Sequence, residues 1–132
     1  MKNTMRRAFT IFIAAMLVVC LCACGSAKLS ESVDFSACDE ITIVLSDETT
    51  AVLGENDLKT VKNILSSGVQ TEGTDDFDGG ISLEIRKDGA IKNTVHLYSA
   101  DKITVDDNTS VVFKITDEDY KSLEKIIDNY KL

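Results

Sequence analysis

The sequence is short of the residues on which most enzyme chemistry depends. Its 132 residues include one histidine, His96, and no tryptophan or proline, and aromatic residues make up 6%. A single imidazole does not fit the Cys/His spacing of a zinc site. There is no Gly-x-Ser-x-Gly elbow, and no glycine-rich loop with a lysine precedes a helix. We therefore expect a protein that is not an enzyme and needs no cofactor.

Residues 1–24 have the pattern of an export signal. Three basic residues and no acidic ones lie in positions 1–7, and residues 8–22 carry no charge. A basic start, a short apolar core and a small residue at the cut site are typical of a secretory signal. A membrane-spanning helix needs about 20 apolar residues, and the run over 8–25 is shorter. An uncleaved anchor remains the alternative.

The stretch Leu21-Cys22-Ala23-Cys24 resembles the lipobox of bacterial lipoproteins. The resemblance covers residues 1–24 and implies cleavage before Cys24, which would then carry lipid such as palmitate. Cys20 and Cys22 fit less well because a large residue directly precedes each of them. Two acyl chains, each contributing about 0.8 kcal/mol per buried methylene, would hold the protein to a membrane. The implied location is the extracytoplasmic side of the cell membrane.

Cleavage before Cys24 would divide the chain into three segments. Residues 1–23 would be the signal peptide, 24–38 the lipidated cysteine with a short tether, and 39–132 one folded domain. The mature chain would keep eleven basic residues against 22 acidic ones, a net charge of −11. Such an excess of acid disfavours nucleic acid as a partner. Cys38 would have no cysteine to pair with, and we expect a small buried residue there.

Alternation and helical periodicity predict an α+β domain. Asp88-Gly89 between two alternating runs is a strong hairpin signal. Asn56 is the expected cap of the first helix, and Thr116 with Asp119 forms a capping box for the second. The predicted order is β-β-α-β-β-β-β-α, with strands at 40–46, 49–53, 81–86, 91–98, 103–105 and 111–115 and helices at 57–67 and after Thr116.

Tight turns between the strands favour an antiparallel sheet of five to six strands. The two amphipathic helices should pack on one face of this sheet, which leaves the other face open. This layout over residues 39–132 resembles the small uncharacterised α+β domains of Gram-positive lipoproteins. That resemblance brings no functional site with it.

The open sheet face is the candidate binding surface. Alternation places Ile91 with Val95 and Leu97 on the core side and polar residues on the other. Tyrosine and arginine are enriched in interface centres, so we expect a non-catalytic binding module for a protein of the cell envelope. The residues predicted to share this face are Glu84, Arg86, Lys92, Thr94, His96 and Tyr98.

Two other functions remain open. Asp75, Asp76 and Asp78 lie close together in an acidic loop, and carboxylates on a flexible loop can bind calcium. Their spacing does not match an EF-hand, so this hypothesis is a weak cation-responsive module without a standard metal site. The second alternative is a small envelope enzyme or inhibitor, which would need a cleft near His96 or Cys38.

Overall fold

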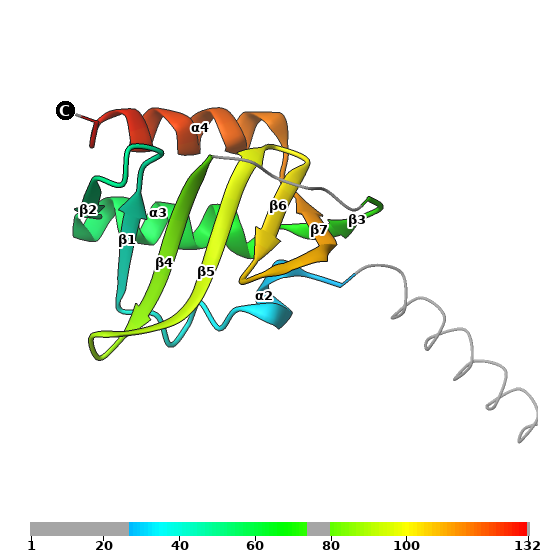
Figure 1. Ribbon diagram of the computed structural model, residues 1–132, viewed down its shortest axis with the longest axis horizontal. Coiled ribbons are helices and arrows are strands. Elements are labelled where there is room, and N and C mark those ends of the chain that lie inside the picture. The colour runs from blue at the N-terminus through cyan, green and yellow to red at the C-terminus, as the bar shows by residue number, and fades with distance from the viewer. Residues whose placement is uncertain (1–26, 74–79, 132) are drawn as a thin grey trace, which may run out of the picture.

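The computed structural model describes residues 27–73 and 80–131, which form one α+β domain (Figure 1). The described helices are α2 (Leu29–Ser32), α3 (Glu55–Ser66) and α4 (Asp117–Asp128). The described strands are β1 (Glu40–Val44), β2 (Thr50–Val52), β3 (Val69–Thr71), β4 (Ile81–Lys87), β5 (Ala90–Ser99), β6 (Lys102–Val105) and β7 (Asn108–Lys114). They form one antiparallel sheet in the order β2-β1-β4-β5-β6-β7-β3.

The predicted fold class is confirmed, but the predicted numbers of strands and helices are wrong. Among the described residues the sheet has seven strands and there are three helices, so β3 and α2 were missed. Both elements are too short to show a period in the sequence. β3 exists because β7 pairs with it, with Gln70 opposite Phe113. Long-range pairing therefore defines a strand that local alternation does not show.

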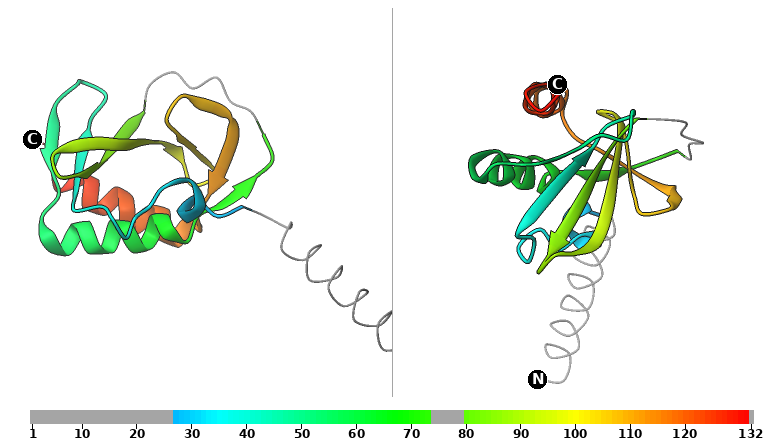
Figure 2. Two further views of the ribbon diagram at one scale, coloured as in Figure 1. Left: turned by 90° about the horizontal axis from the view of Figure 1, so that it is seen from below. Right: turned by 60° about the vertical axis from the view of Figure 1, so that its left-hand side comes forward.

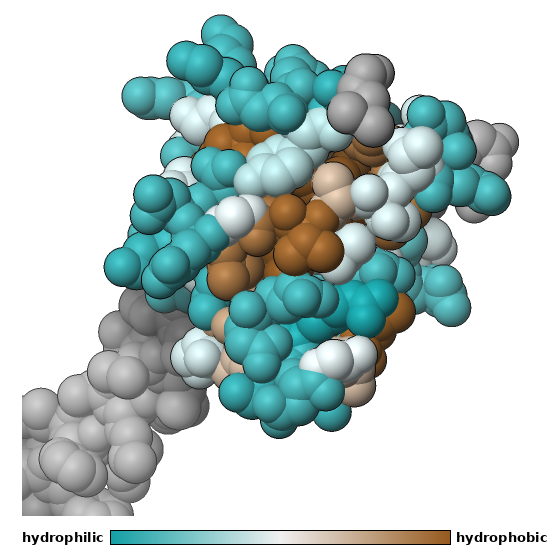
Figure 3. Space-filling model, turned by 90° about the vertical axis from the view of Figure 1, so that its left-hand side faces the viewer, coloured by the Kyte–Doolittle hydropathy of each residue, from teal (hydrophilic) through white to brown (hydrophobic). Residues whose placement is uncertain are grey.

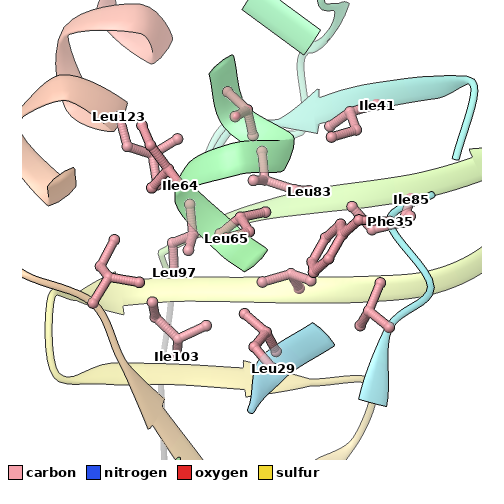
Figure 4. Packing of buried hydrophobic residues seen from close by; sticks show 14 of the residues in the cluster. Leu29, Phe35, Ile41, Ile64, Leu65, Leu83, Ile85, Leu97, Ile103 and Leu123 are labelled. Atoms are coloured by element: carbon pink, nitrogen blue, oxygen red, sulfur yellow. The ribbon is translucent and has the colours of Figure 1, made fainter. Parts of the chain in front are cut away.

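One face of the sheet supplies the core. Register places Ile43 opposite Leu83, and Leu83 opposite Val95. All three side chains are fully buried. Figure 4 shows residues of this cluster meeting Leu65 of α3 and Leu123 of α4. Burying each such side chain stabilises the fold by roughly 1.5–3 kcal/mol, so this face determines the register of the central strands.

Both long helices lie on that side of the sheet, as expected (Figure 2). The expected cap of α4 is confirmed, because the Thr116 hydroxyl accepts a hydrogen bond of 3.1 Å from the Asp119 amide. The expected cap of α3 is wrong. Gly54 is the N-cap residue in place of Asn56, and no side chain of its own caps the helix. A more distant residue, Tyr130, fills this role.

Residues 29–38 belong to the folded domain, whereas the sequence composition predicted that they form part of the tether. Leu29 and Val33 are buried, at 0% and 1% exposure. The Leu29 amide donates to the Gly68 carbonyl at 2.8 Å, and Lys28 forms a bridge with Val69. A Cβ on Gly68 would lie 3.0 Å from the Leu29 Cβ, so the missing side chain makes this contact possible. The domain therefore begins well before residue 39.

The predicted hairpin between β4 and β5 is confirmed. Asp88 and Gly89 have φ of 52° and 80°, which is the positive-φ pair of a type I′ turn. A bulge then shifts the register between Ile85 and Arg86. The bulge places Ile91 opposite Arg86, where the Ile91 side chain is 49% exposed. The prediction that Ile91 lies in the core is therefore wrong. An extra residue in one strand reverses the side on which the following side chains lie.

Tyr130 joins the two long helices, and its hydroxyl explains how α3 begins. It donates to Asp57 Oδ2 at 2.6 Å and accepts from the Gly54 amide at 2.8 Å. Tyr130→Phe is expected to lower the free energy of unfolding by about 1–2 kcal/mol, because a hydrogen bond to a charged group and a helix cap are lost. Urea denaturation measures this change, and a variant as stable as the wild type would contradict it.

The same contact makes stability depend on alkaline pH. The hydrogen bond to Asp57 raises the pKa of Tyr130 above its usual value of 10.0. A pKa raised by folding stabilises the domain below the unfolded-state value, and this stabilisation is lost as pH rises through the folded-state value. Between about pH 8 and pH 11 the wild type should therefore lose more stability than Tyr130→Phe. Equal losses would show that the hydroxyl makes no such contribution.

Candidate functional site

The side of the sheet opposite the helices carries a polar surface built from β1, β4 and β5. Strand register sets Glu40 opposite Arg86, Glu84 opposite Thr94, and Ser82 opposite His96. We call this surface the polar face. Its members are Glu40, Thr42, Ser82, Glu84, Arg86, Thr94, His96 and Tyr98.

The structure places five of the six residues predicted for this surface on the polar face. They are Glu84, Arg86, Thr94, His96 and Tyr98. Lys92 differs, because it lies at the β4–β5 bulge and has no Cα partner on β4. Period-two alternation predicts shared faces only as long as no residue is inserted, and Lys92 is the residue that the bulge leaves unpaired.

Arg86 is held in place by groups on three sides. Its Nη2 donates to Glu84 Oε1 at 2.9 Å, and its Nη1 donates to the Gly89 carbonyl at 3.2 Å. Its Nε lies 3.8 Å from Glu40 Oε2, and this nitrogen is buried without a hydrogen-bond partner. The Arg86 side chain is 25% exposed. The guanidinium is thus oriented in advance, with part of its surface accessible to a partner.

Glu40 and Ser82 are polar-face residues that sequence reasoning missed. Glu40 belongs to β1, and only the pairing of β1 with β4 brings it to Arg86. That pairing joins strands separated by β2, α3 and β3, so no local pattern shows it. Ser82 alternates with Glu84 and Arg86 in the sequence, and this period-two signal was sufficient to place it.

His96 lies between two partners on the polar face. Its Nδ1 is 2.9 Å from the Ser82 hydroxyl oxygen, and its ring stacks on Tyr98 with centroids 6.5 Å apart. A Ser–His–Asp triad also needs a carboxylate that orients the imidazole. Among the described residues, no carboxylate forms a hydrogen bond with His96. The geometry orders the imidazole as a rigid, partly exposed contact group.

The polar face is less open than predicted. Thr104, directly opposite His96, is 1% exposed, and Val112 on β7 is 3% exposed. Figure 2 shows β7 turning out of the plane of β4 and β5. The accessible part of the face is therefore restricted to β1, β4 and β5, where the side chains are half-buried except for Thr42, which is 7% exposed.

Three clefts of the described domain lie beside α4 and its C-terminal end. The largest, about 650 Å³, is lined by Ser67, Lys114, Asp117 and Tyr120 among others. Burial raises the pKa of Tyr120, with a smaller contribution from Glu124. The linings of these three clefts include neither His96 nor Cys38.

Cys38 is buried, as expected. Its exposure is 6%, and its thiol donates to the Glu40 carbonyl at 3.3 Å. The ammonium group of Lys62 donates to the Cys38 carbonyl at 2.7 Å. These contacts join the segment before β1 to α3. Cys38 therefore acts as a small core residue within the described part of the chain.

Two of the predicted sites fall outside the described residues. These are the lipidation site Cys24 and the cation candidates Asp75, Asp76 and Asp78. Within residues 27–73 and 80–131, no cluster of three or more His, Cys, Asp or Glu side chains is arranged to hold a metal ion. In the same part of the chain, each helix is too short or too polar to cross a membrane.

The fold and the polar face define a small α+β domain with an antiparallel sheet that helices cover on one side. No protein-family model, curated protein or solved structure matches the chain.

Proposed function

We propose that the protein is a lipid-anchored lipoprotein on the extracytoplasmic side of the cell membrane, and that its domain is a non-catalytic binding module of the cell envelope. The anchor rests on the Leu21–Cys24 pattern, with lipid on Cys24. The partner is an envelope protein. The net charge of −11 expected for the mature chain disfavours nucleic acid as a partner.

The single observation that supports binding is the prearranged, partly exposed Arg86 on the side of the sheet opposite the helices. Glu40 and Glu84 hold its guanidinium. An ordered arginine loses little conformational entropy when a partner docks. The stacked His96–Tyr98 pair lies further along the same face, where His96 is opposite Ser82. Arginine and tyrosine side chains of this kind are common among residues that dominate interface energies. The polar face thus offers an ordered guanidinium flanked by two acidic side chains.

Site-specific photo-crosslinking in intact cells tests this proposal. A photoreactive residue at Thr94, half-buried in the centre of the polar face, should form a discrete adduct with an envelope protein. The same residue at Ser122, exposed on α4, is the matched control and should form none. Arg86→Gln combined with His96→Gln should reduce the Thr94 adduct about tenfold, which corresponds to 1.4 kcal/mol of binding energy.

Thermal unfolding of the double variant controls for folding, since both residues are partly exposed and glutamine keeps hydrogen-bonding capacity. An adduct yield at Thr94 that matches Ser122, or that does not respond to the double variant, would refute the polar face as the binding surface.

A further inference from the structure

The two edges of the sheet differ in how they end. At one edge, residues 27–29 run along β3. The Gln70 amide donates to the Ala27 carbonyl at 2.7 Å, and Lys28 forms a bridge with Val69. At the other edge β2 pairs with β1 on one side, and no described strand pairs with it on the other. β2 is therefore the open edge of the described sheet.

The hydrogen-bond pattern shows which backbone groups of β2 point outward. The Leu45 amide donates to the Thr49 carbonyl at 2.9 Å, and the Leu53 amide donates to the Ile41 carbonyl at 3.0 Å. Hydrogen-bonded and non-hydrogen-bonded pairs alternate in an antiparallel ladder. Thr50 and Val52 are thus non-hydrogen-bonded positions, and their N–H and C=O groups point away from β1. These are the groups that an added strand would use.

The surroundings of this edge are apolar at the centre and acidic at both ends. Val52 is 54% exposed. Asp47 and Glu48 precede β2, Glu55 and Asp57 follow it, and residues 41–58 contain no lysine, arginine or histidine. Figure 3 looks onto this side of the molecule and shows a hydrophobic area surrounded by hydrophilic residues.

We propose that β2 binds an extended, basic peptide segment of another protein by strand addition. The backbone of the peptide would pair with Thr50 and Val52, its apolar side chains would cover Val52, and its lysine or arginine residues would lie near Glu48 and Glu55. A second copy of the chain fits less well, because pairing β2 with itself would bring the acidic residues at the ends of the two β2 strands together. This inference concerns the edge of the sheet. Val52 lies opposite Thr42 of the polar face, but the added strand would pair with backbone groups of β2, so the inference does not depend on Arg86 or His96.

Synthetic peptides of alternating lysine and valine, with blocked ends, test the proposal by fluorescence anisotropy. The lysine peptide should bind the domain, and a glutamate–valine peptide of equal length should not. Alternate amides of an extended peptide point to opposite edges of the strand. N-methylation of every second residue therefore gives two further peptides, one methylated at the lysines and one at the valines, and each has one edge blocked. One register should weaken binding about tenfold or more, because its amides face β2, and the other should leave affinity unchanged.

Charge reversal identifies where the peptide lies. Glu48→Lys with Glu55→Lys should weaken binding about tenfold at low salt and remove most of its salt dependence. Glu31→Lys with Glu72→Lys makes the same charge change at exposed positions away from β2 and should leave most of the affinity. Equal binding of both peptides, no binding, or equal effects of the two N-methyl registers would overturn the proposal. Sedimentation that shows a dimer disrupted by Val52→Asp would also overturn it, in favour of self-association.

Discussion

A chain that begins at residue 39 is expected to be unfolded, whereas a chain that begins at Gly25 is expected to fold cooperatively. The difference is the segment assigned to a tether from its composition, which supplies Leu29, Val33 and Phe35 to the core at 0%, 1% and 5% exposure. Each of these side chains contributes roughly 1.5–3 kcal/mol on burial. Their sum approaches the whole stability of a typical domain, about 5–15 kcal/mol.

The shorter chain would also lose residues 27–29, which run along the outer edge of β3. The Leu29 amide and the Ala27 carbonyl bond to backbone groups on either side of Val69. Circular dichroism and urea denaturation of the two chains measure the outcome. A cooperative transition of equal midpoint in the shorter chain would show that residues 27–38 are not part of the fold.

A point variant separates packing from chain length. Leu29→Ala in the longer chain should lower the free energy of unfolding by about 2–5 kcal/mol, the usual range for a fully buried leucine. Ser30→Ala, at the next and exposed position of α2, is the matched control and should stay within about 0.5 kcal/mol of the wild type.

Cys24→Ala is expected to abolish incorporation of labelled palmitate in cells. This change removes the proposed acceptor thiol, and with it the two acyl chains that would give stable membrane attachment. The protein should then appear in the soluble extracytoplasmic fraction or keep its signal, which adds 23 residues to its mass. Cys22→Ala is the matched control and should remain labelled and membrane-bound. Labelling that persists in Cys24→Ala would contradict the lipobox interpretation.

Several features were predictable because neighbouring residues determine them. Asp88-Gly89 gives the β4–β5 turn through two positive φ angles, 52° and 80°, which few other residue pairs adopt readily. Thr116 caps α4 through the amide three residues later. Alternation along β4 and β5 likewise placed Glu84, Arg86 and Thr94 on one face.

Other features depended on contacts between distant segments. β3 and α2 are each too short to show a period, and they form because β7, Gly68 and the core lie beside them. The bulge at Ile85/Arg86 moved Ile91 out of the core and Lys92 out of register. Tyr130 replaces the cap expected from Asn56 because α4 brings its hydroxyl to Gly54.

Local patterns in the sequence were sufficient to predict the α+β class, the main hairpin, the two amphipathic helices and most of the polar face, since these follow from turn chemistry and periodicity. Three features became visible only in the three-dimensional structure: where the domain begins, which edge of the described sheet is open, and the contact between Glu40 and Arg86. The reason is physical: strand order and the burial of short segments depend on pairing between residues far apart in the chain, which leaves no local pattern.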